Sequence, residues 1–217
     1  MEISVLLYDR FTALDCMGPY EVLSRIPGAR LRFIAKKAGP VVTDTGMLTV
    51  MAEAALKDVS RPDIILIPGA PGDAVEAALA DAEIVEWVVR AHETTRWTTS
   101  VCTGALVLGA AGILEGLDAT THWASIARLE SFGAHYTEQR VVRQGKIITG
   151  AGVSAGIDMG LTLVAAECGD DFAKGLQLAI EYDPKPPFDC GSPNKAPAYI
   201  KDMILAVMAA GREGVAA

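Results

Sequence analysis

The stretch from Thr98 to Gly112 constrains the fold of this chain more than any other segment. It begins with β-favouring and polar residues, passes through Cys102, and continues with small and apolar residues typical of a buried helix. The pattern predicts a sharp strand-to-helix turn, a nucleophile elbow with Cys102 at its corner. The N–H groups of a helix beginning at Thr103 would favour the thiolate. The alternative is a buried structural cysteine, a common fate of a free thiol.

Composition limits the possible partners. The 217 residues are 51% hydrophobic and 6% aromatic, which is enough for one aliphatic core, and the net charge is −8. The low pI of about 4.9 argues against nucleic acid as a partner. The longest apolar run is shorter than the roughly 18 residues that span a bilayer, and the basic start of a signal peptide is missing. The four cysteines form no CxxC pair, so we expect a cytoplasmic protein without membrane association, metal or disulfides.

Strand and helix patterns alternate along the whole chain. We expect strands at residues 3–8, 31–35, 41–43, 48–50, 63–67, 98–101, 119–121, 141–143 and 146–149. We expect helices at residues 20–26, 73–92, 103–112, 124–132, 154–168, 170–181 and 199–210. Pro19 is expected to open the first of these helices. The alternation predicts one α/β domain, residues 1–217, with a mainly parallel sheet.

Three loops should meet at the carboxyl edge of that sheet, where open α/β folds place their sites. They contain Asp15, Gly69 and Cys102. Asp15 could cap a helix, but Gly18 and Pro19 follow it and favour a carboxyl held near the thiol. Gly69 could be a simple turn residue, or it could let a backbone N–H approach a developing negative charge.

Several short motifs resemble those of the ThiJ/PfpI superfamily in order and spacing. They are Leu14-Asp15-x-x-Gly18-Pro19, Ile67-Pro68-Gly69, Ser100-Val101-Cys102-Thr103-Gly104, Ala119-Thr120-Thr121-His122-Trp123 and Thr149-Gly150-Ala151-Gly152. This resemblance implies the class I glutamine amidotransferase-like fold, a single-domain flavodoxin-like sandwich with helices on both faces of the sheet. Residues 181–188 and 191–193, together with Asp15, are similar to the isocyanide hydratase branch.

That branch adds water to an isocyanide and forms an N-substituted formamide without a cofactor. The resemblance implies that Cys102 is the nucleophile, that Asp15 is the general acid and base, and that the Thr103 hydroxyl interacts with the Asp15 carboxyl. It also implies a homodimer. We expect Gly69, Gly152 and Val153 to contribute backbone groups. His122 and Trp123 should border the pocket, although ordinary packing would also explain both side chains.

The chemistry separates the possible reactions. Amide hydrolysis needs an acid for the departing amine, usually a histidine, and none lies next to Cys102 in the sequence. His92 and His135 are expected to be solvated, and His122 is expected to be structural. Isocyanide hydration needs only one proton-transferring group, because the leaving group is a thiolate. Asp15 with Cys102 therefore fits hydration better than proteolysis.

Three other functions remain open at this point. A cysteine-dependent glyoxalase or deglycase would act on small dicarbonyls, but its relatives carry glutamate in place of Asp15. A ligand-sensing half of an AraC-type regulator would continue for roughly a hundred residues into a basic helix-turn-helix module, whereas this chain stops at Ala217 and is acidic. A redox sensor without catalysis would use Cys102 as its oxidisable thiol.

Overall fold

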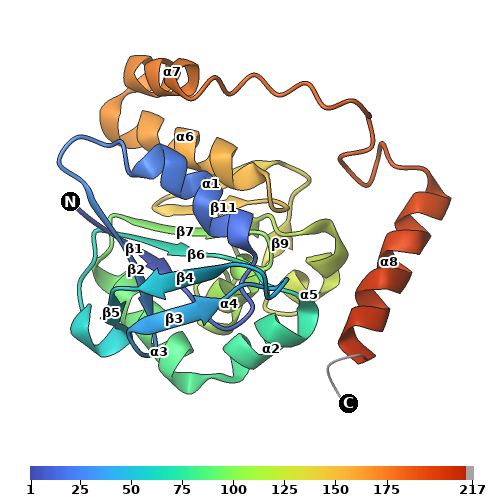
Figure 1. Ribbon diagram of the computed structural model, residues 1–217, viewed down its shortest axis with the longest axis horizontal. Helices are drawn as coiled ribbons and strands as arrows, with labels where there is room; N and C mark the ends of the chain where they lie inside the picture. Colours follow the sequence, from blue (N-terminus) through green and yellow to red (C-terminus); the bar gives the residue numbers. More distant parts are fainter. Residues whose placement is uncertain (214–217) are drawn as a thin grey trace.

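Seven strands form the central sheet of this computed structural model, which describes residues 1–213 (Figure 1). The order across the sheet is β10-β11-β7-β6-β1-β2-β5, and every neighbouring pair is parallel except β10 with β11. The strands are β1 Glu2–Leu6, β2 Arg30–Ala35, β5 Ala54–Ala55, β6 Ile64–Ile67, β7 Trp97–Val101, β10 Val141–Gln144 and β11 Ile147–Gly150. The expected mainly parallel α/β sheet is confirmed. Residues 214–217 of the expected domain lie outside the described part.

The central strands are buried on both faces, because their alternate side chains enter two different cores. On β6, Ile65 and Ile67 pack with α2, α3 and α4, whereas Ile64 and Leu66 pack with α1 and α6. Continuous apolar runs are typical of parallel strands covered on both sides. Because β1, β6 and β7 are parallel neighbours held between two layers of helices, their carboxyl ends lie at one edge of the sheet. The loops that follow these three strands therefore lie together at that edge.

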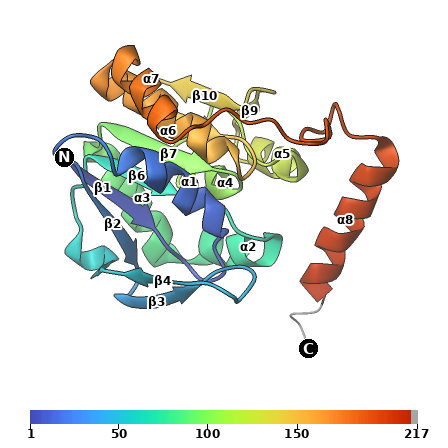
Figure 2. The same ribbon diagram turned by 45° about the horizontal axis from the view of Figure 1, so that its top comes forward.

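Helices cover both faces of the sheet, and Figure 2 shows the two layers from a second side. Helices α1, α6 and α7 pack together on one face, and α2 to α5 pack on the other. Their bounds are α1 Ala13–Leu23, α2 Gly72–Ala80, α3 Ala82–Thr94, α4 Gly104–Ala110, α5 Ile126–Glu130, α6 Ala155–Cys168 and α7 Asp170–Ala179. The last helix of the described part is α8 Ala198–Glu213, which stands off the body in both views.

The first helix begins earlier than expected. We predicted a helix opened by Pro19 over 20–26, but α1 runs from Ala13 to Leu23 and includes Pro19. Proline costs a backbone hydrogen bond inside a helix. Here the ring packs against α6, where an added Cβ at Gly156 would lie 3.0 Å from Pro19 Cδ. Tertiary packing therefore overrides the local signal, and Asp15 lies in the first turn of a helix and not in a loop.

The helix expected over 73–92 is two helices. Asp81 has an extended conformation between α2 and α3, and its side chain accepts a hydrogen bond from the Glu83 N–H. An N-cap of this kind starts a new helix. The remaining short elements are β3 Gly39–Val42 with β4 Thr49–Ala52, β8 Asp118–Ala119 with β9 His135–Tyr136, and the 3₁₀ turns Leu56–Asp58 and Trp123–Ser125. No helix within residues 1–213 is both long and apolar enough to cross a membrane.

The start of α4 lies directly against the end of β6, which predicts that Gly104 tolerates no side chain. An added Cβ there would overlap the Ile67 carbonyl oxygen and lie 2.8 Å from the Pro68 carbonyl group. We expect Gly104→Ala to lower the free energy of unfolding by about 1–3 kcal/mol, because rigid backbone must move. Urea unfolding followed by circular dichroism measures this change.

Gly175→Ala on α7 is the matched control, because an added Cβ there meets nothing within 4 Å. This variant should gain about 0.5–1 kcal/mol from better helix propensity. Equal stability of the two variants would contradict the predicted contact between α4 and β6.

Candidate active site

Cys102 occupies a sharp corner between β7 and α4. Its φ is +59°, a left-handed conformation that is unusual for a residue with a side chain. The surrounding backbone holds this conformation: the Cys102 N–H donates to the carbonyl oxygens of Gly150 and Ala151 at 3.0 and 2.8 Å. The Thr121 hydroxyl donates to the Cys102 carbonyl oxygen at 2.9 Å. The corner expected from the sequence is therefore present, with the side chain only 5% exposed.

Asp15 points from the first turn of α1 toward this corner and is completely buried. Its Oδ2 accepts a hydrogen bond from the Gly69 N–H at 2.7 Å. Its Oδ1 has no hydrogen-bond partner among the described residues. Burial raises the pKa of this carboxyl to about 7, although the hydrogen bond from the Gly69 N–H and the nearby Cys102 thiol both lower it. Asp15 can therefore change protonation state near neutral pH.

Gly69 is the point where the three loops meet. An added Cβ at this position would lie 2.6 Å from Thr103 Oγ1 and 2.8 Å from Asp15 Oδ2, so only glycine fits. The sequence left open a turn residue or a backbone N–H that approaches a developing negative charge, and the structure uses the Gly69 N–H to hold Asp15. The Gly69 carbonyl oxygen accepts from the Thr12 N–H at 2.8 Å, which fixes the start of α1 to the same loop.

The Thr103 hydroxyl does not make the expected hydrogen bond to Asp15. It donates to the Ala70 carbonyl oxygen and accepts from the Ala70 N–H, both at 2.9 Å. The reason is geometric, since the Gly69 N–H already occupies the near oxygen of Asp15. Thr103 therefore joins the Cys102 corner to the loop after β6 and lies beside the carboxyl without bonding to it.

The thiol of Cys102 keeps its proton in the resting protein. Burial and the nearby Asp15 carboxylate raise its pKa above the ordinary range, whereas the N–H groups of Val153 and Thr103 lower it by hydrogen bonding. The helix start lowers the pKa of this thiol, as expected, but burial has the larger effect, so the net shift is opposite to the one that the helix start alone would give. Desolvation of a charged sulfur outweighs two backbone donors when no cation is close. Asp15 is the ionisable group next to this thiol.

The pocket residues expected from the sequence lie along one cavity of about 480 Å³. Val153 connects this cavity to the sulfur, because it lines the cavity and its backbone N–H lowers the pKa of Cys102. The cavity is lined by Thr121, His122, Trp123, Tyr136, Glu138, Gln139, Arg140, Ala151, Gly152, Val153, Ser154, Gly191, Ser192 and Pro193.

His122 has the structural contacts that we expected. Its ring centroid lies 5.6 Å from that of Trp123, and its Nδ1 accepts from the Ala124 N–H at 3.3 Å. Gly152 leaves room for the ring, since an added Cβ would lie 3.1 Å from its Cδ2. Burial lowers the His122 pKa, which keeps the ring neutral.

The other two histidines differ in their surroundings. His135 is exposed, as expected. His92 is half-buried and not fully solvated as expected, and its Nδ1 is 2.8 Å from the Thr98 hydroxyl. It lies where β7 begins, at the opposite end of that strand from Cys102.

The structure adds site residues that the sequence analysis missed. Tyr8 lies beside Asp15 and Cys102, and its hydroxyl donates to the Pro68 carbonyl oxygen at 2.7 Å. Ala70 holds Thr103, and Thr121 holds the Cys102 carbonyl. Tyr8 follows the first strand at the carboxyl edge of the sheet, a position that could have identified it. Ala70 acts through its backbone and gives no signal in the sequence.

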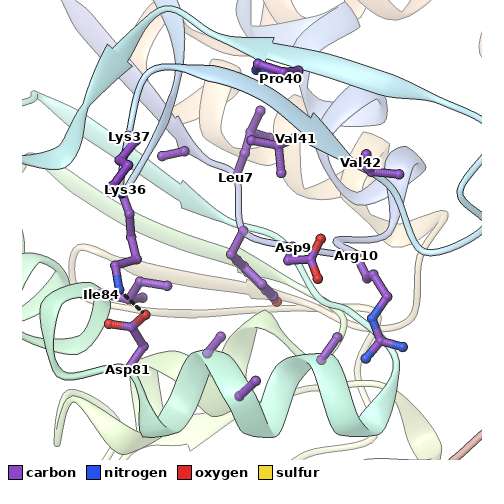
Figure 3. A pocket seen from close by; sticks show the side chains of 15 residues that line it. Leu7, Asp9, Arg10, Lys36, Lys37, Pro40, Val41, Val42, Asp81 and Ile84 are labelled. Atoms are coloured by element: carbon purple, nitrogen blue, oxygen red, sulfur yellow. Dashed lines mark hydrogen bonds and ion pairs between the residues drawn. The ribbon is translucent and has the colours of Figure 1, made fainter. Parts of the chain in front are cut away.

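A second cavity of about 480 Å³ lies between the β3–β4 hairpin and α2, on the other side of Tyr8 (Figure 3). Figure 3 shows Lys36 reaching Asp81 at one end and Arg10 at the other. Cys102 and Asp15 do not line it. Within residues 1–213, no group of three histidine, cysteine or acidic side chains is placed to hold a metal ion.

Known proteins resemble this chain in sequence and in fold. The sequence model of the DJ-1/PfpI family matches residues 1–166. The isonitrile hydratase of Pseudomonas putida is 41% identical over 202 residues, which cover 93% of this chain and 87% of that protein. The HTH-type transcriptional regulator CdhR of Pseudomonas aeruginosa is 31% identical over 77% of this chain, which matches 48% of the regulator.

A solved structure agrees with these sequence comparisons. The crystal structure of a ThiJ/PfpI family protein from Pseudomonas syringae superposes with a TM-score of 0.92 and 38% identity. The aligned residues cover 98% of this chain and 87% of the Pseudomonas syringae chain. The match runs through the corner of Cys102 and the helix of Asp15, and this chain belongs to the DJ-1/PfpI family.

Proposed function

We propose that this protein is an isocyanide hydratase that adds water to an isocyanide through a cysteine thioimidate. The observation that carries the proposal is the buried pair of Cys102 and Asp15, in which a carboxyl with a pKa of about 7 lies next to a protonated thiol. Such a carboxyl can accept and return one proton near neutral pH. The similarity to the Pseudomonas putida isonitrile hydratase supports the same conclusion.

In the first half of the reaction, the Asp15 carboxylate removes the proton from the Cys102 thiol. The sulfur then bonds to the terminal carbon of the isocyanide, and Asp15 returns the proton to that same carbon. The product is a thioimidate, with one carbon–sulfur bond and one carbon–hydrogen bond formed and no charge left behind. Burial assists this step, because a desolvated thiolate is a stronger nucleophile and is quickly consumed.

In the second half, Asp15 accepts a proton from water while the water oxygen bonds to the thioimidate carbon. The same proton passes to the imine nitrogen of the thioimidate, and the carbon is then tetrahedral. Collapse of this intermediate breaks the carbon–sulfur bond, and the hydroxyl proton returns to the sulfur through Asp15. The formamide leaves, and both groups regain their starting protonation.

The neighbouring residues position this pair. Gly69 orients Asp15 by its N–H, and Thr103 fixes the corner through Ala70. The N–H groups of Val153 and Thr103 stabilise negative charge on the sulfur when the thiol loses its proton. Gly152, His122 and Trp123 border the cavity that would hold the substituent of the isocyanide.

The proposal includes a homodimer in the cytoplasm. All four cysteines are free, and Cys190 is exposed, which suits a reducing compartment. The acidic charge of −8 does not suit a nucleic acid partner. Amide hydrolysis is disfavoured, because the one half-buried histidine of the cavity is neutral and already accepts a backbone hydrogen bond.

Replacing Cys102 by Ala or Ser should abolish the conversion of an alkyl or aryl isocyanide to its formamide, because the covalent intermediate cannot form. Product formation followed by mass spectrometry tests both the function and the nucleophile. Cys190→Ser is the control, since this exposed thiol lies outside the site and its loss should leave turnover unchanged. Formamide production by Cys102→Ala would refute the assignment, and its absence in the unmodified protein would refute the function.

Asp15→Asn should reduce kcat about a hundredfold or more, because the amide keeps the shape of the side chain but cannot carry the proton. Steady-state kinetics with the same isocyanide measures the loss. Asp9→Asn is the matched control, since this exposed carboxyl precedes α1 in the loop after β1 and lines the second cavity. Near-normal turnover of Asp15→Asn would show that another group moves the proton.

The pH profile should follow Asp15. Below its pKa of about 7, Asp15 is protonated and cannot accept the thiol proton, so activity is lost as the pH falls. We expect kcat/KM to decrease by about tenfold for each pH unit below about 6 and to be level from about 8 to 9. Measurements from pH 5 to 9 test this. If kcat/KM decreased at low pH with an apparent pKa near 4, the result would contradict the raised pKa of Asp15.

A further inference from the structure

Tyr8 carries a buried hydroxyl that the proposed reaction does not use. The residue follows β1 at the carboxyl edge of the sheet, and its side chain belongs to the same core as Ala70 and Ala74. It is only 6% exposed. Burial raises the pKa of this hydroxyl well above its ordinary value. The group therefore keeps its proton and remains a hydrogen-bond donor between about pH 5 and 9.

The acceptor of this hydroxyl is one end of a peptide unit whose other end holds Asp15. The Tyr8 hydroxyl donates to the Pro68 carbonyl oxygen at 2.7 Å, and the Gly69 N–H donates to Asp15 Oδ2 at 2.7 Å. A trans peptide unit is planar, and its C=O and N–H groups point in opposite directions. Tyr8 and Asp15 therefore hold the Pro68–Gly69 peptide from its two sides.

The local sequence alone does not fix the orientation of this peptide. Turning the peptide over changes ψ of Pro68 and φ of Gly69. The proline ring fixes only φ, and glycine accepts both signs of φ. In the reversed orientation, the Pro68 carbonyl oxygen would face the Asp15 carboxyl in place of the N–H. No backbone N–H within residues 1–213 donates to the Pro68 oxygen, so the Tyr8 hydroxyl is the donor that holds this end.

The hydrogen bond at one end of the peptide also strengthens the hydrogen bond at the other end. A donor on the carbonyl oxygen polarises the amide, so its N–H becomes a better donor. The bond from the Gly69 N–H favours the ionised form of Asp15, because it lowers the pKa of the carboxyl against the effect of burial. The Tyr8 hydroxyl can therefore act on the carboxyl through this peptide.

We propose that Tyr8 is a positioning residue, whose hydroxyl holds the Pro68–Gly69 peptide in the orientation in which the Gly69 N–H reaches Asp15 Oδ2. Removal of the hydroxyl weakens that N–H bond, and the carboxyl then holds its proton more strongly. The expected effect on turnover rests on the proposed function, whereas the expected effect on Asp15 itself does not.

Tyr8→Phe tests this role, because it removes one oxygen atom and keeps the ring in the core. The titration of Asp15 measures the effect directly and can be followed by ¹³C NMR of protein labelled at the aspartate carboxyl carbons. We expect the midpoint of this titration to rise by about 0.5–1 pH unit, since the carboxylate loses stabilisation from the Gly69 N–H. Asp15→Asn identifies the resonance, which is missing from the spectrum of that variant.

Tyr20→Phe is the matched control, because it removes the same group from a tyrosine on α1. The Tyr20 ring packs against Phe33, with the ring centroids 5.8 Å apart, and lines neither of the two large cavities. The midpoint of Asp15 should stay at its value in the unmodified protein, and circular dichroism checks that both variants keep the fold. An unchanged or lower midpoint in Tyr8→Phe would overturn the proposal.

The kinetics of isocyanide hydration give a second readout, which a purely structural loss would not reproduce. Tyr8 does not line the cavity beside Cys102, so KM at pH 9 should stay within about twofold. At pH 6, kcat/KM should be about three- to tenfold lower than in the unmodified protein, because the acid limb moves with Asp15. A loss by the same factor at pH 6 and pH 9 would overturn the positioning role.

Failure of the proposed function would be distinguishable from failure of this inference. If the unmodified protein makes no formamide, the proposed function is wrong. The NMR titration uses no isocyanide, so it still decides whether the Tyr8 hydroxyl acts on Asp15.

Discussion

The hydrogen bond from the Gly69 N–H to Asp15 Oδ2 is the contact on which the rest of the site depends. It joins the loop after β6 to the first turn of α1, and Thr12 returns a second bond to the Gly69 carbonyl oxygen. Thr103 binds Ala70 next to it, so the Cys102 corner is tied to the same loop. A side chain at Gly69 would collide with both Thr103 and Asp15. The three loops can approach this closely only around a glycine.

Burial determines how this pair can react. It raises the pKa of Asp15 to about 7 and raises the pKa of Cys102 further, so the two groups compete for a proton in a region with little water. When the surroundings of two titratable groups give them different pKa values, one group can act as the acid and the other as the base. A histidine is not needed, since the carboxyl titrates in the range that a histidine usually covers. Asp15 Oδ1 has no hydrogen-bond partner among the described residues, so this oxygen is the one that is open to a proton.

The cavity beside Cys102 is built from parts that are far apart in the chain. The 3₁₀ turn at His122 and the loop after β11 supply two sides, and residues 191–193 supply another. The last of these belongs to the long exposed segment between α7 and α8, which has few contacts of its own.

The sequence by itself determined the α/β architecture, the parallel central strands and the corner at Cys102. Continuous apolar runs and the change from β-favouring to small residues are local signals, and a strand covered on both faces has little freedom to depart from them. The sequence also predicted that Asp15 lies near the thiol, because both residues follow strands that end at the carboxyl edge of the sheet. The start of α1 at Ala13 did not, because packing of Pro19 against Gly156 overrides the local preference of proline.

Only the tertiary structure decided the partners and charges within the site. The Gly69 N–H goes to Asp15, and the Thr103 hydroxyl goes to Ala70, because the three loops compete for a few donors in one crowded space. The thiol is protonated because desolvation, which no sequence pattern measures, outweighs the backbone donors at the helix start. Protonation states and hydrogen-bond partners depend on distances between segments that are remote in the chain, and folding alone fixes those distances.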